Sequence, residues 1–362
     1  MNLRVSKEEL SAAVKLARMT AAKVTSLPIL THIKLVAQDG RLTLESNDGE
    51  RSVTASIEAE VLEPGGIALP AKLLGEMCQN LTGIVEITVD GLTAKVVAGR
   101  TSFSLSGLPL DEFPNTASVS DKVAMEVGAK QLDEVIEQTL FCCSNDETHQ
   151  ALRGVRLHWK DGILTAVSTD THRLAIRRIE VPICTEEFEC IVHRDALEVF
   201  SKALVAAPEK VQLRVAPNGI ILVAGDTSVY SRNIEGAFPN YERAIPTKFD
   251  SSIVGQREMW LGTMKHVAPV LSDDQVKRAI FTVADGQMEV SAKCNSTASV
   301  TETIPVVGAD TLIAINAVYV REALDAMQGD EVTMQLSGAL TQVLMTGACD
   351  GYSLILMPMQ ID

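Results

Sequence analysis

The feature of this sequence that most constrains its fold is an internal repeat of about 123 residues. Two alternating strands flanking an Asp-Gly turn occur three times, with the turns at Asp39-Gly40, Asp161-Gly162 and Asp285-Gly286. Such a pattern is a strong hairpin signal, because both central residues of the tight turn need a positive φ. The turns recur after 122 and 124 residues. The chain therefore contains three copies of one supersecondary unit.

Other segments recur in step with the hairpins. A short apolar strand leading into an amphipathic helix follows each turn, at residues 67–74, 190–197 and 312–320. Phe113-Pro114-Asn115 and Phe238-Pro239-Asn240 lie 125 residues apart, after alternating strands at 101–105 and 227–232. Since independent segments keep the same spacing, chance recurrence of a common turn is a poor explanation.

Each copy also opens with a helix. Ser6 and Glu9 form a capping-box pattern before the first, and Leu132, Val135 and Ile136 mark the second. The third helix, expected around Met259, Met264 and Val267, has a weaker pattern. The copies predict an α+β fold of three domains at residues 1–121, 122–248 and 249–362. Their joins are expected near Ser120-Asp121-Lys122 and Thr247-Lys248-Phe249.

Composition narrows the class of protein. With 46% hydrophobic and 22% charged residues, the chain is typical of a globular protein, and the lack of an apolar leader or membrane-length apolar run predicts a cytoplasmic one. Seven scattered cysteines without zinc spacing predict reduced, mostly buried thiols and no metal. The net charge of −15 argues against a protein that coats nucleic acid with its whole surface, but it permits a local basic face.

Tandem α+β units with strands at their edges can join sheet to sheet, and a closed ring removes exposed edges. Six segments in a fixed order carry a resemblance that covers the whole chain: Leu27-Pro28-Ile29-Leu30, Phe103-Ser104-Leu105-Ser106, residues 113–115, 168–175 and 238–241, and the terminal Met357-Pro358-Met359. With these segments, the chain resembles the bacterial sliding clamps, which are the β subunit and processivity factor of DNA polymerase III.

The resemblance implies a non-catalytic protein without a cofactor. Two half rings would close head to tail, with strands outside and helices lining a hole around duplex DNA. The ring would encircle DNA without sequence specificity and tether the replicative polymerase and other replication or repair proteins. No Gly-x-x-x-x-Gly-Lys-Ser/Thr loop occurs in the sequence, so an external clamp-loader ATPase would have to open the ring.

The resemblance also implies a groove that binds a short peptide of partner proteins. Its residues would be Leu152, Thr169, Thr171, His172, Arg173, Leu174, Pro239, Arg243, Ala244, Asn316, Tyr319, Leu340, Ile355, Met357, Pro358 and Met359. Flexible thioethers suit a surface that adapts to several partners. Thr171 stands where glycine is common and Ala244 where a larger aliphatic is common. The tail Gln360-Ile361-Asp362 replaces a basic residue and a final leucine.

Two further sets of residues are carried over from the resemblance. The expected DNA contacts are Arg18, Lys23, Lys15, Lys72, Arg194, Lys202 and Arg321, although the second opening helix carries Asp133, Glu134 and Glu137. The expected dimer interface joins Phe103 and Leu105 at one end of the chain to Val270 and Leu271 at the other.

Two other functions fit parts of the sequence. A repeat scaffold could bind peptides without encircling DNA. Asp170 and His172 could instead belong to a hydrolase, whose turnover His172→Ala would abolish. The sequence offers no recognisable nucleophile or second carboxylate for that chemistry, and neither alternative explains the threefold repeat as economically.

Overall fold

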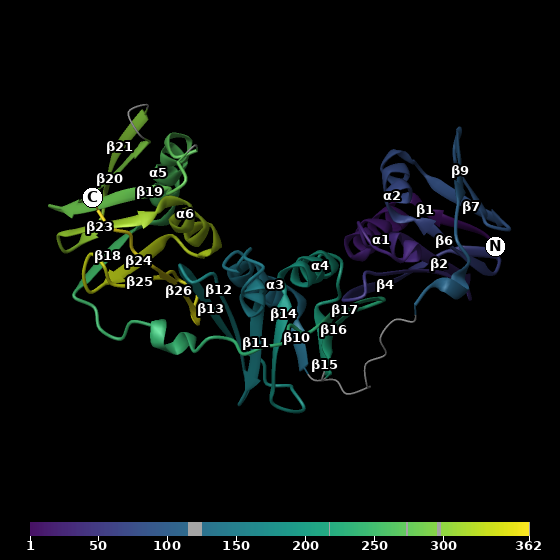
Figure 1. Ribbon diagram of the computed structural model, residues 1–362, viewed down its shortest axis with the longest axis horizontal. Coiled ribbons are helices and arrows are strands. Elements are labelled where there is room, and N and C mark those ends of the chain that lie inside the picture. The colour runs from purple at the N-terminus through teal and green to yellow at the C-terminus, as the bar shows by residue number, and fades with distance from the viewer. Residues whose placement is uncertain (115–124, 217, 273, 295–297, 362) are drawn as a thin grey trace. The chain divides into compact units, whose positions relative to one another are not determined.

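The computed structural model describes residues 1–114, 125–216, 218–272, 274–294 and 298–361 (Figure 1). These residues fall into two compact units. Unit 1 comprises residues 1–133 and 181–233, and unit 2 comprises residues 134–180 and 234–362. The middle repeat is thus divided between the units, and the predicted domain boundaries stay a prediction. The expected join at Ser120-Asp121-Lys122 lies outside the described residues.

Unit 1 contains two sheets. The first runs in the order β5 (Glu60–Glu63), β1 (Asn2–Ser6), β7 (Ile84–Asp90), β8 (Thr93–Ala98) and β9 (Thr101–Ser106). The second runs in the order β10 (Met125–Gly128), β15 (Lys210–Ala216), β16 (Gly219–Ala224), β17 (Thr227–Arg232), β4 (Arg51–Glu58), β3 (Arg41–Asn47), β2 (His32–Gln38) and β6 (Gly65–Pro70). Strand β17 of the second repeat pairs antiparallel with β4 of the first, so two repeats share one sheet.

Unit 2 has the same kind of junction. One sheet includes, in order, β11 (Gly154–Lys160), β12 (Ile163–Thr169), β13 (Arg173–Glu180), β26 (Tyr352–Leu356), β25 (Val343–Thr346), β24 (Glu331–Leu336), β18 (Ser251–Gln256) and β22 (Val307–Gly308). Another runs β21 (Ala298–Pro305), β20 (Gln287–Cys294), β19 (Arg278–Ala284) and β23 (Thr311–Asn316). Strand β13 of the second repeat pairs with β26 of the third.

Six helices occur in the described parts of the chain, two in each repeat. Unit 1 holds α1 (Lys7–Thr20), α2 (Ala71–Asn80) and α4 (Arg194–Leu204), which follows β14 (Phe188–His193). Unit 2 holds α5 (Arg257–Val270) and α6 (Ala317–Ala326), and α3 (Ala129–Leu140) crosses the unit boundary. Short 3₁₀ turns are η1 (Pro28–Thr31), η2 (Leu110–Glu112), η3 (Gln150–Arg153) and η4 (Tyr241–Ala244).

The three predicted Asp-Gly hairpins are confirmed. They connect β2 to β3, β11 to β12 and β19 to β20. The aspartates each have φ 51°, and the glycines have φ 74°, 83° and 73°. Both central residues are therefore left-handed, as the tight hairpin turn requires. The capping box is confirmed as well, since Ser6 Oγ accepts from Glu9 N at 3.2 Å and donates to its carboxylate at 2.9 Å.

The core and the thiols follow the expected pattern with one difference. Trp260 and Phe281 are each 1% exposed and centre the core of unit 2, but Met259, expected on the buried face of the third opening helix, is exposed. All seven cysteines are free thiols, and burial raises the pKa of Cys190 to about 12. Among the described residues, no helix is long and apolar enough to cross a membrane.

Candidate functional site

The turn between β12 and β13 is built by its own polar side chains. Asp170 Oδ1 accepts from the backbone N–H of His172 and of Arg173, each at 3.0 Å. Thr169 Oγ1 donates to Arg173 O at 2.7 Å and accepts from Thr171 N at 3.1 Å. These short-range bonds hold residues 169–173 in a compact turn, as Asp and Thr side chains do in many loops.

Thr171 is the strained residue of this turn. Its φ is 77°, in the left-handed region that β-branched residues avoid. Such a conformation costs on the order of 1–3 kcal/mol and persists only where the surroundings fix it. The bonds of Asp170 and Thr169 supply that fixation. Glycine, the residue common here in the family that the sequence resembles, would adopt the same φ without the steric penalty.

We therefore expect Thr171→Gly to raise the free energy of unfolding by about 1 kcal/mol, because relief of strain exceeds the extra chain entropy of glycine. Urea titration measures the change. Thr247→Gly is the matched control: Thr247 lies in an exposed loop and is absent from the positive-φ residues, so the same exchange there should be neutral or destabilising. A loss of stability in Thr171→Gly would contradict the strain.

Arg173 connects the turn to two other segments. Its guanidinium pairs with Glu322 on α6 and donates to Asp170 Oδ2 at 2.9 Å and to Phe141 O at 2.6 Å. It also lies over the rings of Tyr319 and Phe141, 4.4 Å and 5.3 Å from their centroids. Several of its N–H donors are thus engaged within the chain, so Arg173 positions its neighbours in addition to carrying charge.

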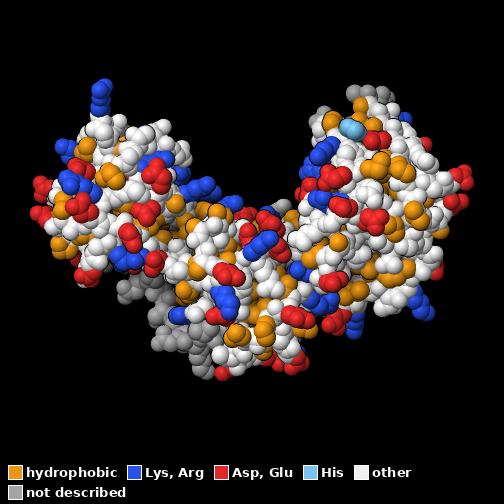
Figure 2. All heavy atoms as spheres, turned by 180° about the vertical axis from the view of Figure 1, so that it is seen from behind, with side chains coloured by type: hydrophobic (Ala, Val, Ile, Leu, Met, Phe, Trp, Pro, Cys, Tyr) orange, Lys and Arg blue, Asp and Glu red, His pale blue; other side chains and the backbone are white. Residues whose placement is uncertain are grey.

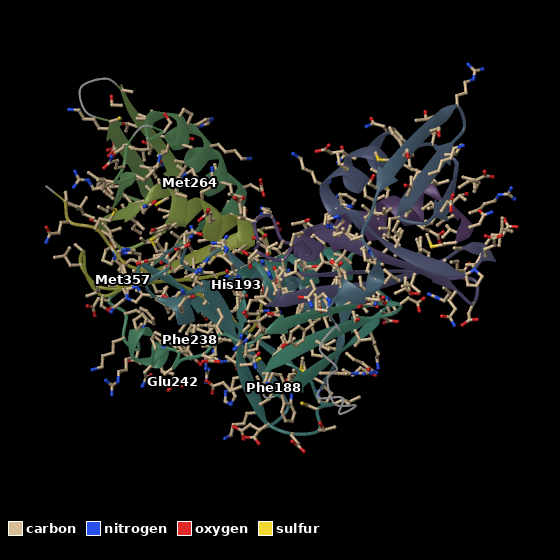
Figure 3. All side chains as sticks on the ribbon, turned by 45° about the vertical axis from the view of Figure 1, so that its right-hand side comes forward. Phe188, His193, Phe238, Glu242, Met264 and Met357 are labelled. Carbon is tan, nitrogen blue, oxygen red and sulfur yellow. The ribbon has the colours of Figure 1, made fainter. Side chains whose placement is uncertain are left out.

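An apolar cluster lies beside the turn. Its buried members are Val167, Leu174, Ile176 and Ile355, from β12, β13 and β26. Half-buried apolar side chains of the segment 238–245 and of β25 pack against them: Phe238, Tyr241, Ala244, Ile245 and Leu344. Phe238 is labelled in Figure 3, and Arg156 lies over the Tyr241 ring at 5.7 Å. Partly exposed apolar groups over a rigid sheet are suited to receive apolar side chains of a partner.

The terminal residues run beside this cluster. Strand β26 pairs with β13, with Leu356 opposite Arg173. Beyond the strand, Met357 N donates to His172 O and Met359 N donates to Ala314 O, each at 2.8 Å. Met357, which is labelled in Figure 3, is 38% exposed, as its position in an adaptable binding surface would require. The terminal Met-Pro-Met segment is therefore held by backbone bonds while leaving a thioether accessible.

The other residues predicted for the peptide groove differ in burial and in their contacts. Leu152 is buried in η3, whereas Leu340 is 66% exposed, and Pro239 and Arg243 are exposed. Asn316 caps α6, its Oδ1 accepting from Val318 N at 2.9 Å, so its amide nitrogen is the group left to meet a ligand. Sequence reasoning missed Phe238 and Tyr241, although both belong to the Phe-Pro-Asn-Tyr motif.

The geometry does not support a hydrolase. Both carboxylate oxygens of Asp170 accept bonds from the turn and from Arg173, and His172 presents an exposed side chain. A general base needs a carboxylate directed at the imidazole or the reacting group. Asp170 instead stabilises the turn.

The predicted basic residues of unit 1 lie on packed helices. Helix α1 contacts both α2 and α4. Lys15, Lys72 and Lys202 are exposed, as is Lys23 just beyond α1, and Arg18 and Arg194 are half-buried. Arg18 crosses α2 at Gly75, where an added Cβ would stand 2.1 Å from Arg18 Cδ. Arg321, in unit 2, is half-buried on α6. On the face drawn in Figure 2, Lys and Arg side chains are interspersed with Asp and Glu.

The four predicted interface residues differ in burial. Phe103 and Val270 are half-buried, whereas Leu105 is 6% and Leu271 1% exposed. Leu271 belongs to the core of unit 2. A side chain that is already buried gains little from association, so Leu271→Ala would act on folding and cannot isolate an interface.

Comparison with known proteins covers nearly the whole chain. Three models of the DNA polymerase III beta subunit match it: the N-terminal domain at residues 1–117, the central domain at 126–240 and the C-terminal domain at 242–360. The beta sliding clamp of Pseudomonas putida is 28% identical over 368 residues, covering 100% of both chains. That of Synechococcus elongatus is 28% identical, covering 96% of this chain and 95% of its own.

Solved structures agree in fold. A DNA polymerase sliding clamp from Bacillus subtilis superposes with a TM-score of 0.92 at 24% identity, covering 100% of both chains. A sliding clamp from Pseudomonas aeruginosa bound to griselimycin gives the same values. The three domain models match in tandem order, in agreement with a chain of three clamp domains, and the predicted boundaries stay a prediction. The chain therefore belongs to the DNA polymerase III beta subunit family, the DNA sliding clamps, which act as non-catalytic processivity subunits.

Proposed function

We propose that this chain closes head to tail with a second copy into a ring around duplex DNA, and that partner peptides bind beside its terminal Met-Pro-Met. Family membership supports the ring. The observation that carries it is sheet continuity across repeats, β4 with β17 in unit 1 and β13 with β26 in unit 2. A third junction of that kind, between two copies, would close the ring.

Edge strands are available for that third junction. Within the described residues, β9 is the last strand of its sheet and pairs with β8, and β21 is the last strand of its sheet and pairs with β20. An uncovered edge presents unpaired backbone donors and acceptors, which a second chain can satisfy. Phe103 lies on β9, at such an edge. The proposed dimer interface would therefore use Phe103 and Val270, whereas Leu105 and Leu271 are buried within their own units.

We expect Phe103→Ala combined with Val270→Ala to raise the dimer dissociation constant by about tenfold or more, because each half-buried side chain would lose roughly 1 kcal/mol of burial. Sedimentation over a dilution series measures it. Leu340→Ala removes a 66% exposed apolar side chain from the proposed peptide site and should leave association unchanged. An unaltered dimer in the double variant would remove both residues from the interface.

DNA would pass through the ring without being read. The exposed Lys15, Lys23, Lys72 and Lys202, with Arg18, Arg194 and Arg321, supply modest positive charge on or beside helices, against a net charge of −15. Scattered cations attract phosphates without fixing a register. Gly75 lets the Arg18 side chain lie across α2. Helix α3 carries Asp133, Glu134 and Glu137 against one lysine, Lys130. Acidic side chains weaken the attraction to phosphates, and weak attraction favours sliding over tight binding.

The partners that the function requires are the replicative polymerase, a clamp-loader ATPase and other proteins with a short clamp-binding peptide. The apolar cluster beside the 169–173 turn supports apolar anchors, and His172 and the amide nitrogen of Asn316 support one polar side chain such as glutamine. Because the proposed function requires chromosomal DNA and its polymerase, we expect the protein to lie in the cytoplasm.

A further inference from the structure

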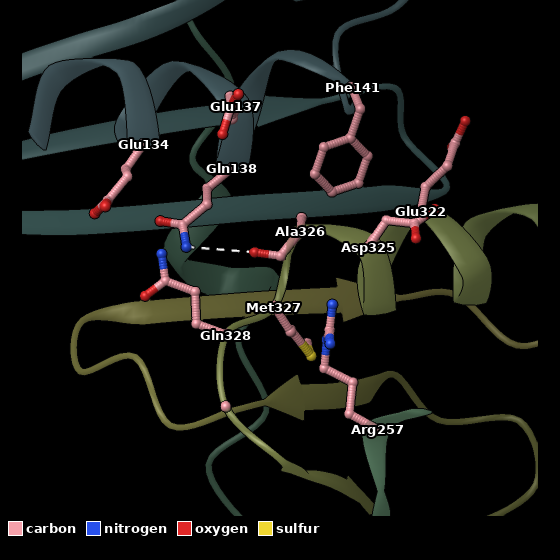
Figure 4. A pocket seen from close by; sticks show the side chains of 11 residues that line it. Glu134, Glu137, Gln138, Phe141, Arg257, Glu322, Asp325, Ala326, Met327 and Gln328 are labelled. Atoms are coloured by element: carbon pink, nitrogen blue, oxygen red, sulfur yellow. Dashed lines mark hydrogen bonds between the residues drawn. The ribbon is translucent and has the colours of Figure 1, made fainter. Parts of the chain in front are cut away.

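A second pocket lies between α3 and α6 of unit 2, and the peptide site does not account for it (Figure 4). Its volume is about 650 Å³. It is lined by α3, the start of α5, α6 and the segment after α6, and the lining includes Glu137, Gln138, Phe141, Asp325 and Met327. Within the described chain, no group of three or more His, Cys, Asp or Glu side chains is placed to hold a metal ion.

Negative charge dominates this pocket. Glu134, Glu137, Glu322 and Asp325 contribute carboxylates, and Arg257 contributes the one guanidinium in the lining. Arg257 is engaged elsewhere, because its Nε donates to Leu324 O at 2.9 Å and its Nη1 to Glu258 Oε1 at 2.8 Å. Glu322 is paired with Arg173. The exposed carboxylates of Glu137 and Asp325 remain to attract a cation from solution.

Gln138 gives the pocket a buried acceptor. The residue is 3% exposed, and its Nε2 donates to Ala326 O at 3.3 Å. This bond orients the amide, since the reversed orientation would set two oxygens against each other. Oε1 then has no hydrogen-bond partner among the described residues. Figure 4 shows the nitrogen turned to Ala326 and the oxygen on the side of Glu134. A buried acceptor of this kind is normally satisfied, which makes Gln138 Oε1 the atom that a donor on a ligand could meet.

We propose that the pocket binds an alkylammonium ion. One N–H would be donated to Gln138 Oε1, the charge would be balanced by Glu137 and Asp325, and the methylene chain would lie against Phe141 and Met327. Free aliphatic polyamines and the lysine side chains of a partner share this chemistry. The four carboxylates in the lining outnumber the one guanidinium of Arg257, which favours a cation over an anion.

Isothermal titration calorimetry at low ionic strength tests the proposal on the full-length protein, with spermidine and with a blocked lysine amide as separate probes. We expect saturable binding of at least one. Gln138→Leu should weaken it by about tenfold or more, because a hydrogen bond to a charged donor is lost. Glu137→Gln with Asp325→Asn should weaken it by roughly fivefold to tenfold. Glu289→Gln, an exposed charge on β20, is the matched control and should change nothing.

The two probes distinguish between the two possible sources of the alkylammonium group. Spermidine alone assigns a free polyamine, and the lysine probe alone assigns a protein side chain. Should Gln138→Leu lower thermal stability, the double variant decides, because Glu137 and Asp325 are exposed and tolerate the exchange. Failure of both probes to bind, or equal affinity in the wild type and the double variant, overturns the proposal. Neither result bears on the ring or on peptide binding.

Discussion

Linearising a loaded circular DNA should release this protein, whereas the intact circle should retain it. A ring held by topology leaves when it reaches a free end, because nothing in its contacts must break. The net charge of −15 and the interspersed charges on the face in Figure 2 are consistent with weak phosphate contacts. The expected effect is nearly all or none, because a ring at a free end has no bond that must break before it leaves.

Salt distinguishes topology from direct binding in the same experiment. A protein holding DNA through six to ten phosphates loses about 10³–10⁵ in affinity between 50 and 200 mM salt. Retention of the loaded ring on circles should scarcely change over that range. The assay loads the protein onto a nicked circle with a clamp loader, cuts with a restriction enzyme, and separates bound from free protein by gel filtration.

Linear DNA with both ends blocked by bulky proteins is the control and should retain the ring. Persistence on linear DNA with free ends would rule out encirclement. A peptide-binding scaffold that never surrounds DNA would show no difference between circle and line, so this result also decides between the two functions.

Local rules explain which parts of the fold were predictable. The Asp-Gly hairpins and the Ser6 capping box depend on residues within a few positions of each other, and both are confirmed. The short strands that precede α1, α3 and α5 were not predicted. Each has only four to six residues, and β1 forms its sheet with β7, about 80 residues away. No local pattern reveals such a partner.

In the candidate site too, features set by neighbouring residues were predictable and contacts between distant residues were not. The resemblance located the 169–173 turn and the terminal Met-Pro-Met, which the structure joins through Met357 N and His172 O. It could not reveal that Arg173 is engaged by Glu322, a residue 149 positions away. Nor could it separate Leu271, in the core, from Val270 beside it. In a sequence, an apolar residue of the core cannot be told from an apolar residue of an interface. Only its burial within the folded chain distinguishes the two.

Removing residues 357–362 should abolish peptide binding while the dimer survives. The deletion removes the backbone bonds from Met357 N to His172 O and from Met359 N to Ala314 O, and with them the segment beside the apolar cluster. The proposed interface residues Phe103 and Val270 lie in other elements. We expect at least a tenfold loss of affinity, because a few anchors carry most of the energy of such a site.

Fluorescence anisotropy with a labelled peptide bearing a glutamine and a terminal Leu-Phe pair measures the loss, and sedimentation checks the dimer. Removing residues 360–362 alone is the matched control, since it shortens the chain but keeps both methionines. Met357→Ala should cost about 1–2 kcal/mol, because its 38% exposed side chain contributes more to binding than to the fold. If the chain lacking 357–362 binds as tightly as the control, the terminal segment is structural. The peptide site would then have to lie on the apolar side chains of 238–245, where Tyr241→Ala would become the decisive variant.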